Sequence, residues 1–255
     1  MLKLTASQDV SEFLASADKV EARSVLGAVE TEDLVSMTLV TAADDTIKGY
    51  VGNIGSNAFY GQSDLKALSL GSSVTSIASG SGYEGAFYGC TGFTGSLVIP
   101  NSVTTIGGNA FYNCTGFTSL IIGNSVTTIR TATFRDCSSL TGSLTIPNSV
   151  TSIGSYAFYN CSALTSLTIP NLVTSIGVSA FRNCSGFTGS LVIPNSVTTI
   201  GSSAFYGCTG FTRININKSV APTIAASAFN GMTGVSPAVI HVPVGATGYA
   251  ASYSG

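Results

Sequence analysis

The stretch CSALTSLTIPNLVTSIGVSAFRN, residues 161–183, decides the fold because the chain repeats it on both sides. Residues 137–160 read CSSLTGSLTIPNSVTSIGSYAFYN, and residues 184–207 read CSGFTGSLVIPNSVTTIGSSAFYG. Each copy begins with a cysteine, 23 or 24 residues after the last, at Cys90, Cys114, Cys137, Cys161, Cys184 and Cys208. Phenylalanines keep this step apart from one longer interval, at Phe59, Phe87, Phe111, Phe134, Phe158, Phe181, Phe205 and Phe229.

This period predicts a repeat solenoid of the leucine-rich-repeat type, whose repeats are about 20–29 residues long. A single coil cannot bury its apolar face alone, so neighbouring coils stack and build a continuous core. The parallel strands of adjacent coils should lie about 4.8 Å apart. We expect a right-handed array of about eight coils, with a parallel sheet on one side and mostly extended or 3-10 structure on the convex side.

Within one coil the apolar residues predict two short strands. Leu167 and Ile169 alternate with polar residues and should point inward. Pro170 follows and should end the strand, because proline lacks the N–H that a central ladder requires. Val173 and Ile176 should point inward from the second, shorter strand.

The position two residues after each phenylalanine holds only Gly, Asn or Asp. These residue types tolerate a positive φ better than others. We therefore predict a left-handed turn in every coil, at Gly61, Gly89, Asn113, Asp136, Asn160, Asn183, Gly207 and Gly231.

Charge divides the chain into segments. Only 9% of the residues are charged and the net charge is -2, which gives no reason to expect nucleic-acid binding. Residues 1–50 hold nine of the twelve acidic side chains. The helix-like spacing of Val10, Phe13 and Leu14 predicts a helical N-terminal cap or small helical module over residues 1–46. Repeats should cover residues 47–235, and a C-terminal cap residues 236–255.

Copies such as IPNSVTSIGSYAF, residues 146–158, and IPNSVTTIGSSAF, residues 193–205, closely resemble the BspA-like leucine-rich repeats of bacterial surface proteins. The resemblance covers roughly residues 47–243. It implies a surface-displayed or secreted, non-enzymatic adhesion protein that binds a protein or glycan on a host or neighbouring cell.

Two features bear on where such a protein acts. No signal peptide is visible, and no apolar run is long enough to insert into a membrane. The segment EARSVLGA, residues 21–28, is similar to a short pattern of phage tail-fibre proteins, which leaves a receptor-binding protein of the virion as an alternative.

The six cysteines predict a ladder of buried, reduced thiols. They occupy the same point of each coil, so their side chains run parallel, which does not suit the torsion of about 90° that a disulfide requires. We expect no metal or other cofactor, because there is no CxxC motif and His241 is the only histidine. His241 and the many serines lack a partner that would make them catalytic.

A threonine column gives a third functional alternative. Thr104, Thr127, Thr151, Thr174 and Thr198 recur along the second strand, and such arrays can order water in ice-binding proteins. The simpler interpretation is β-propensity combined with solubility, and we favour it.

Two surfaces are candidates for a partner. The outward strand positions should form a concave face: Ser96, Val98, Ser119, Ile121, Ser143, Thr145, Ser166, Thr168, Ser190, Val192, Arg213 and Asn215. That face lacks aromatic anchors. The position after each phenylalanine instead holds Tyr60, Tyr88, Tyr112, Arg135, Tyr159, Arg182, Tyr206 and Asn230, which we call the ridge.

Exchange between Tyr and Arg predicts that the ridge is exposed, because unpaired arginine is almost never fully buried. Tyr and Arg are also enriched at binding hot spots. The predicted binding residues are therefore Tyr88, Tyr112, Arg135, Tyr159, Arg182 and Tyr206. The alternative is that the rings only stack on one another and stabilise the turns.

Overall fold

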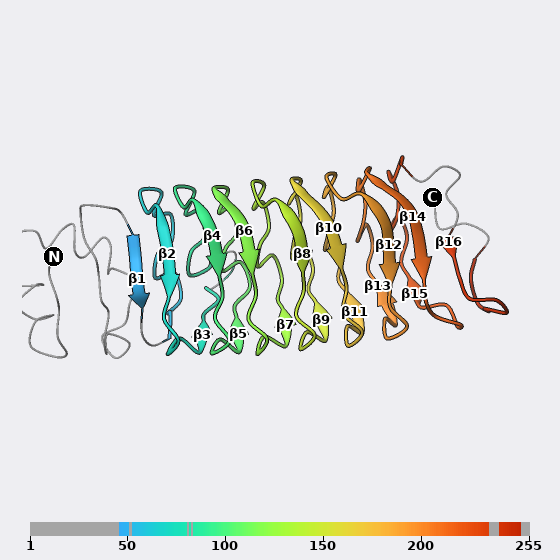
Figure 1. The fold of residues 1–255 in the computed structure, drawn as a ribbon, viewed down its shortest axis with the longest axis horizontal. Coiled ribbons are helices and arrows are strands. Elements are labelled where there is room, and N and C mark those ends of the chain that lie inside the picture. Colours follow the sequence, from blue (N-terminus) through green and yellow to red (C-terminus); the bar gives the residue numbers. More distant parts are fainter. Residues whose placement is uncertain (1–45, 51–52, 81, 83, 235–239, 251–255) are drawn as a thin grey trace, which may run out of the picture.

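The structure is a computed structural model that describes residues 46–50, 53–80, 82, 84–234 and 240–250. It is a parallel β-solenoid in which each coil contributes one longer and one short strand (Figure 1). The helical module predicted over residues 1–46 lies outside the described residues except for Thr46, which begins the first strand. No helix occurs in the part of the chain that the structure describes.

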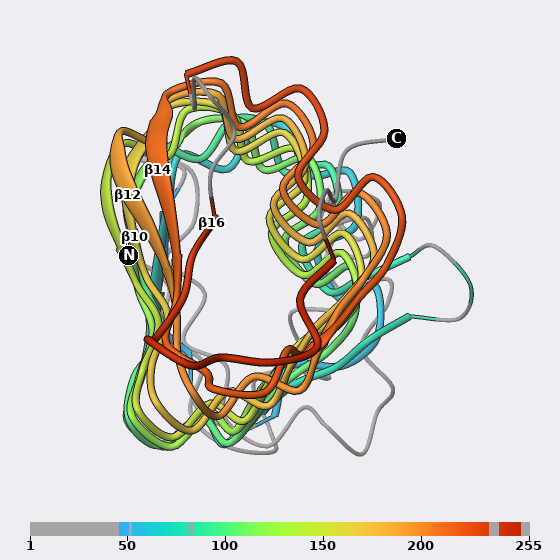
Figure 2. The ribbon, with the colours of Figure 1, turned by 90° about the vertical axis from the view of Figure 1, so that its right-hand side faces the viewer.

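The longer strands lie along one side of the solenoid and pair in parallel. Their bounds are β1 (Thr46–Tyr50), β2 (Ala67–Leu70), β4 (Gly95–Val98), β6 (Phe117–Ile121), β8 (Gly142–Thr145), β10 (Leu164–Thr168), β12 (Gly189–Ile193) and β14 (Phe211–Ile216). The two-residue strand β16 (Ile240–His241) continues this series by pairing with β14. Seen end-on, the coils lie almost directly over one another (Figure 2).

The short strands form a second parallel series. They are β3 (Ser76–Ile77), β5 (Thr105–Ile106), β7 (Thr128–Ile129), β9 (Ser152–Ile153), β11 (Ser175–Ile176), β13 (Thr199–Ile200) and β15 (Thr223–Ile224). The last five pair in the order β15-β13-β11-β9-β7. Ile176 is in register with Ile153 on one side and Ile200 on the other, so equivalent residues of successive coils stack.

The core is a set of such columns. Phe158 is fully buried and stacks between Phe134 and Phe181, with ring centroids 5.3 and 5.5 Å apart. Ile169, Val173 and Ile176 are buried, as predicted.

Leu167 is an exception, because it is only partly buried although it packs against the core. Leu144, its partner in β8, is buried. The two coils differ by one glycine: Gly142 has a φ of +74° and the pairing register shifts beside it. Opposite the adjacent residues Gly142 and Ser143, β10 has one additional residue, Thr165, so the bulge lies in the strand of the shorter coil. After Gly142, β8 alternates between exposed and buried positions.

The side opposite the longer strands consists of successive turns, and in the described residues it forms neither extended strand nor 3-10 helix, unlike the prediction. The N–H of Phe158 donates to the carbonyl of Ala180 in the next coil at 2.8 Å, so the turns are tied to one another. The predicted left-handed column is confirmed at all eight positions, with φ between 57° and 72°.

A second left-handed column lies two residues before the phenylalanine, which the sequence did not reveal. Its residues have a φ between 52° and 59°, although only two of them are Asn: Asn57, Asn109, Ala132, Tyr156, Ser179, Ser203 and Ser227.

The insertion before Phe87 forms a loop that leaves the body of the solenoid (Figure 2). Ser79 and Gly85 close it with an antiparallel bridge. At the other end, β16 adds to β14, and the hydroxyl of Tyr249 donates to the carbonyl of Lys218 at 2.7 Å. The described part of the predicted C-terminal cap thus stacks in parallel on the last coil.

Candidate partner-binding surface

The turns hold the ridge residues in line. In each coil a phenylalanine, buried in all but the coil of Phe229, precedes the ridge residue, and the left-handed residue follows it. The N–H of that left-handed residue donates to the ridge carbonyl of the next coil, as Asp136 does to Tyr159 at 2.8 Å and Asn160 to Arg182 at 2.9 Å. The ridge side chains are therefore placed one above another by the backbone.

The first part of the ridge is a stack of tyrosines. The rings of Tyr60 and Tyr88 lie 5.0 Å apart and those of Tyr88 and Tyr112 lie 4.6 Å apart, with planes inclined by 12° and 10°. Tyr60 remains 46% exposed. Burial raises the pKa of Tyr112 above its usual value, and the positive charge of Arg135 partly opposes this shift.

Arg135 continues the stack as a cation between aromatic rings. Its guanidinium carbon lies 5.0 Å from the ring centre of Tyr112, 4.8 Å from that of Tyr159 and 5.4 Å from that of Tyr156. Such cation–π contacts stabilise by about 0.5–2 kcal/mol, depending on desolvation. The Nε of Arg135 also donates to Oδ2 of Asp136 at 3.3 Å.

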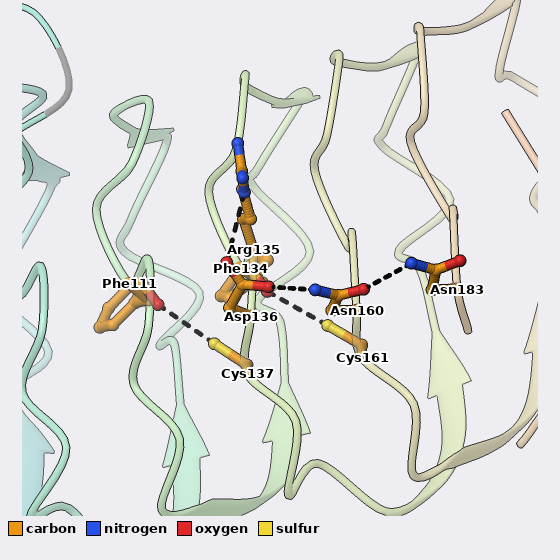
Figure 3. A network of polar contacts seen from close by, with 8 residues as sticks. All are labelled: Phe111, Phe134, Arg135, Asp136, Cys137, Asn160, Cys161 and Asn183. Atoms are coloured by element: carbon orange, nitrogen blue, oxygen red, sulfur yellow. Dashed lines mark hydrogen bonds and ion pairs between the residues drawn. The ribbon is translucent and has the colours of Figure 1, made fainter. Parts of the chain in front are cut away.

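Asp136 anchors a ladder of amides beside the ridge (Figure 3). Nδ2 of Asn160 donates to Oδ1 of Asp136 at 2.7 Å, and Nδ2 of Asn183 donates to Oδ1 of Asn160 at 2.9 Å. Because an ionised carboxylate only accepts, it fixes the direction of both amides. Both carboxylate oxygens of Asp136 are thus engaged, one by Arg135 and the other by Asn160.

Arg182 repeats this arrangement without the carboxylate. Its guanidinium carbon lies 4.4 Å from the ring centre of Tyr206. The residue that follows is Asn183 instead of an aspartate. Among the described residues, the Nε of Arg182 has no hydrogen-bond partner.

The structure thus brings Tyr88, Tyr112, Arg135 and Tyr159 into one continuous stack and joins Arg182 to Tyr206. The stacking is what the alternative interpretation of the ridge predicts. It does not bury the ridge, since Tyr206 is 37% exposed and the other ridge members are half-buried or exposed. Contact with a partner stays a prediction.

The cysteine ladder is buried as predicted, and none of the six thiols is bridged to another. Each S–H donates to the carbonyl of a phenylalanine in the preceding coil, as Cys137 does to Phe111 at 3.1 Å (Figure 3). Burial raises the pKa of the Cys137 thiol to about 12. Because the thiolate is the reactive form, we expect these buried thiols to react slowly in the folded chain.

Other candidate sites offer less. In the described part of the chain, no three His, Cys, Asp or Glu side chains lie close enough to hold a metal ion. His241 is exposed on β16. None of the described residues forms a helix long and apolar enough to cross a membrane.

The threonine column is exposed but lies one residue before each short strand instead of on it. The hydroxyls of Thr104, Thr151, Thr174 and Thr198 donate to backbone carbonyls of the preceding coil. Thr174 donates to Thr151 at 3.1 Å and Thr198 to Thr174 at 3.0 Å. A second such column, which the sequence analysis missed, precedes the longer strands, where Thr141 donates to Thr118 at 3.0 Å. These bonds give the columns a structural role in tying coils together.

The outward face of the longer strands is mostly exposed, as predicted, although Ser119, Ser166 and Asn215 are half-buried. Its largest apolar side chains are Val98, Ile121 and Val192, which are 45%, 58% and 41% exposed. An open groove of about 510 Å³ beside the insertion loop was not predicted from the sequence, although the insertion itself was the signal for it. Its lining includes Ser79, Gly80, Asn109, Arg130 and Thr131.

Parallel strands, stacked phenylalanines and one left-handed turn after each phenylalanine define a leucine-rich-repeat solenoid. A sequence model of the BspA type leucine rich repeat region matches residues 52–188 and 187–243 in six copies. The chain belongs to this family.

Solved structures agree with the assignment. A leucine-rich repeat protein from Bacteroides ovatus is 27% identical, with a TM-score of 0.58 over 74% of this chain and 53% of that one. The T. pallidum leucine rich repeat protein is 26% identical, with a TM-score of 0.61 over 78% of this chain and 91% of that one. This chain thus spans about half of the first and most of the second. None of the curated proteins compared matches the sequence.

Proposed function

We propose that this chain is a non-enzymatic binding protein, displayed on a cell surface or secreted, that adheres to a protein or glycan on a host or neighbouring cell through its ridge. The observation that carries the proposal is the continuous stack from Tyr60 through Arg135 to Tyr159, together with the separate pair of Arg182 and Tyr206. Tyr and Arg are the residue types most often found at the centres of binding surfaces.

The stacking itself favours recognition. A flexible side chain loses about 0.5–1.5 kcal/mol of free energy when a partner immobilises it. Ridge side chains already held between their neighbours would lose less. The surrounding surface is rich in Ser, Thr, Asn and Gly, so the ridge is the place where large side chains accumulate in the turns.

The proposal is tested by replacing Tyr112, Tyr159 and Tyr206 together by Ser. The melting temperature and the adhesion of protein-coated beads to cells and matrix-coated surfaces are measured separately, at a temperature where the variant stays folded. We expect adhesion to be lost while the protein remains folded. Lowered melting with adhesion intact would show that the tyrosines serve the turns alone.

A matched control replaces three exposed apolar residues of the strand face by Ser, at Val98, Ile121 and Val192. These substitutions also remove large exposed side chains, but from a different column of the coil. Adhesion should persist in this variant. If adhesion fails here and survives in the tyrosine variant, the strand face is the binding surface and the ridge is not.

A further inference from the structure

The charge distribution separates the two ridge arginines. From Cys137 to the end of the sequence there is no Asp or Glu, while Arg182, Arg213 and Lys218 are positively charged. The last acidic residue is Asp136, and both of its carboxylate oxygens are engaged. No acidic side chain of the following coils is available to neutralise Arg182.

The two arginines otherwise occupy equivalent places. Arg135 is held by a carboxylate and lies against three tyrosine rings. Among the described residues, the guanidinium of Arg182 lies over one ring, that of Tyr206, and its Nε is shielded from solvent without a hydrogen-bond partner. Arg135 is therefore satisfied within the fold, whereas Arg182 is an oriented cation that has no counter-ion among the described residues.

We propose that Arg182, presented on Tyr206, is a subsite for the carboxylate of an acidic sugar. The inference rests on the proposed function, because it names the ligand class of the same ridge. A planar guanidinium that is already oriented by stacking matches a carboxylate with two parallel hydrogen bonds. A lone cation suits an isolated negative charge, whereas a polyanion requires a cluster of basic residues.

The neighbourhood favours a sugar over an acidic peptide. The adjacent ridge positions carry the phenolic hydroxyls of Tyr159 and Tyr206, and the neighbouring column carries the amides of Asn160 and Asn183. Hydroxyls and amides pair with sugar hydroxyls. A peptide partner is expected to place an apolar anchor in a buried pocket. The groups around Arg182 are instead phenolic hydroxyls and side-chain amides.

The test uses the full chain labelled with ¹⁵N and follows the arginine Nε–H signals by NMR. Glucuronate and N-acetylneuraminate are the probes, glucose is the uncharged control, and acetate and a glutamyl peptide are the non-sugar carboxylates. We expect either acidic sugar to shift the Arg182 signal in a saturable way, with a Kd on the order of millimolar for one subsite. Glucose, acetate and the peptide should give at least tenfold weaker binding.

Three variants sharpen the result. Arg182→Gln should abolish the response, and Arg213→Gln, which removes the same charge from β14, should leave it unchanged. Asn183→Asp gives Arg182 the neighbour that Arg135 has and should abolish binding with the arginine still present. Asp136→Asn should free Arg135 and produce a second, sugar-dependent shift.

The proposal is overturned if neither acidic sugar shifts Arg182, if acetate or the peptide binds as tightly, or if Arg182→Gln keeps the response. Adhesion separates this failure from failure of the proposed function. If Arg182→Gln adheres normally while the triple tyrosine variant does not, the ridge binds a partner but not through this carboxylate.

Discussion

At the scale of single residues, the cysteines show how one position can serve two purposes. Cys137 fills a buried column, and its thiol also satisfies the carbonyl of Phe111 in the preceding coil. Each of the remaining five cysteines makes the same hydrogen bond to a phenylalanine carbonyl, at 2.8 to 3.1 Å. An aliphatic residue of similar size would pack there but would leave the carbonyl without this donor.

The raised thiol pKa values predict a loss of stability in alkali. An unfolded thiol ionises near 9, but Cys90, Cys137 and Cys208 keep their protons in the fold up to about 12. The folded state thus binds more protons above pH 9, so the free energy of unfolding should fall as pH rises from 9 towards 12. Each such thiol should contribute a slope of about 1.4 kcal/mol per pH unit.

Urea unfolding between pH 8 and 11 checks this expectation. Cys137→Ser keeps a donor to Phe111 but does not titrate in this range, so it should reduce the slope by the share of one thiol. Ready reaction of a thiol reagent with the native chain, or a stability that stays constant through pH 11, would contradict the account.

At the scale of the repeat element, the turn segment depends on two left-handed columns. The column of Gly, Asn and Asp was predictable because these residue types adopt a positive φ more readily than others. The second column holds Ala132, Tyr156, Ser179, Ser203 and Ser227, whose types do not indicate it. A positive φ costs such residues about 1–2 kcal/mol relative to the right-handed region, and the hydrogen bonds between coils impose it.

Glycine at Ser203 should therefore stabilise the chain. Removal of the strain exceeds the entropy that glycine loses on folding, which leaves a gain of about 0.5 kcal/mol in the free energy of unfolding. Ser190→Gly, in β12, is the matched control and should destabilise by a similar amount, because glycine weakens a strand interior. Equal destabilisation by both substitutions in urea unfolding would argue against the strain.

Periodicity predicted the columns but not the distances between them. The burial of Ile169, Val173 and Ile176 and the exposure of the ridge followed from alternation and from the Tyr–Arg exchange. Leu167 departs from its column, because its coil lacks a residue equivalent to Gly142. The sequence pattern did not show how this absence changes the pairing of β10 with β8. The sequence likewise did not show that the Asp136 carboxylate pairs with Arg135 and Asn160 and leaves Arg182 without a counter-ion among the described residues.

At the scale of the whole molecule, the solenoid is a linear stack in which each coil contacts its neighbours. Stability is then a sum of coil terms and interface terms, so a residue in mid-array has two interfaces and one at the end has fewer. Phe158 stacks on Phe134 and on Phe181. Phe229 stacks on Phe205 at 5.8 Å and is only partly buried.

The free energy of unfolding of Phe158→Ala in urea tests most directly the claim that equivalent residues of successive coils form one continuous core, on which the fold and the ridge both depend. We predict a loss of about 3–5 kcal/mol, as for a fully buried phenylalanine, and a smaller loss for Phe229→Ala. A loss below about 1 kcal/mol for Phe158→Ala would contradict the column assignment, because an alanine in a filled stack leaves a cavity between two rings.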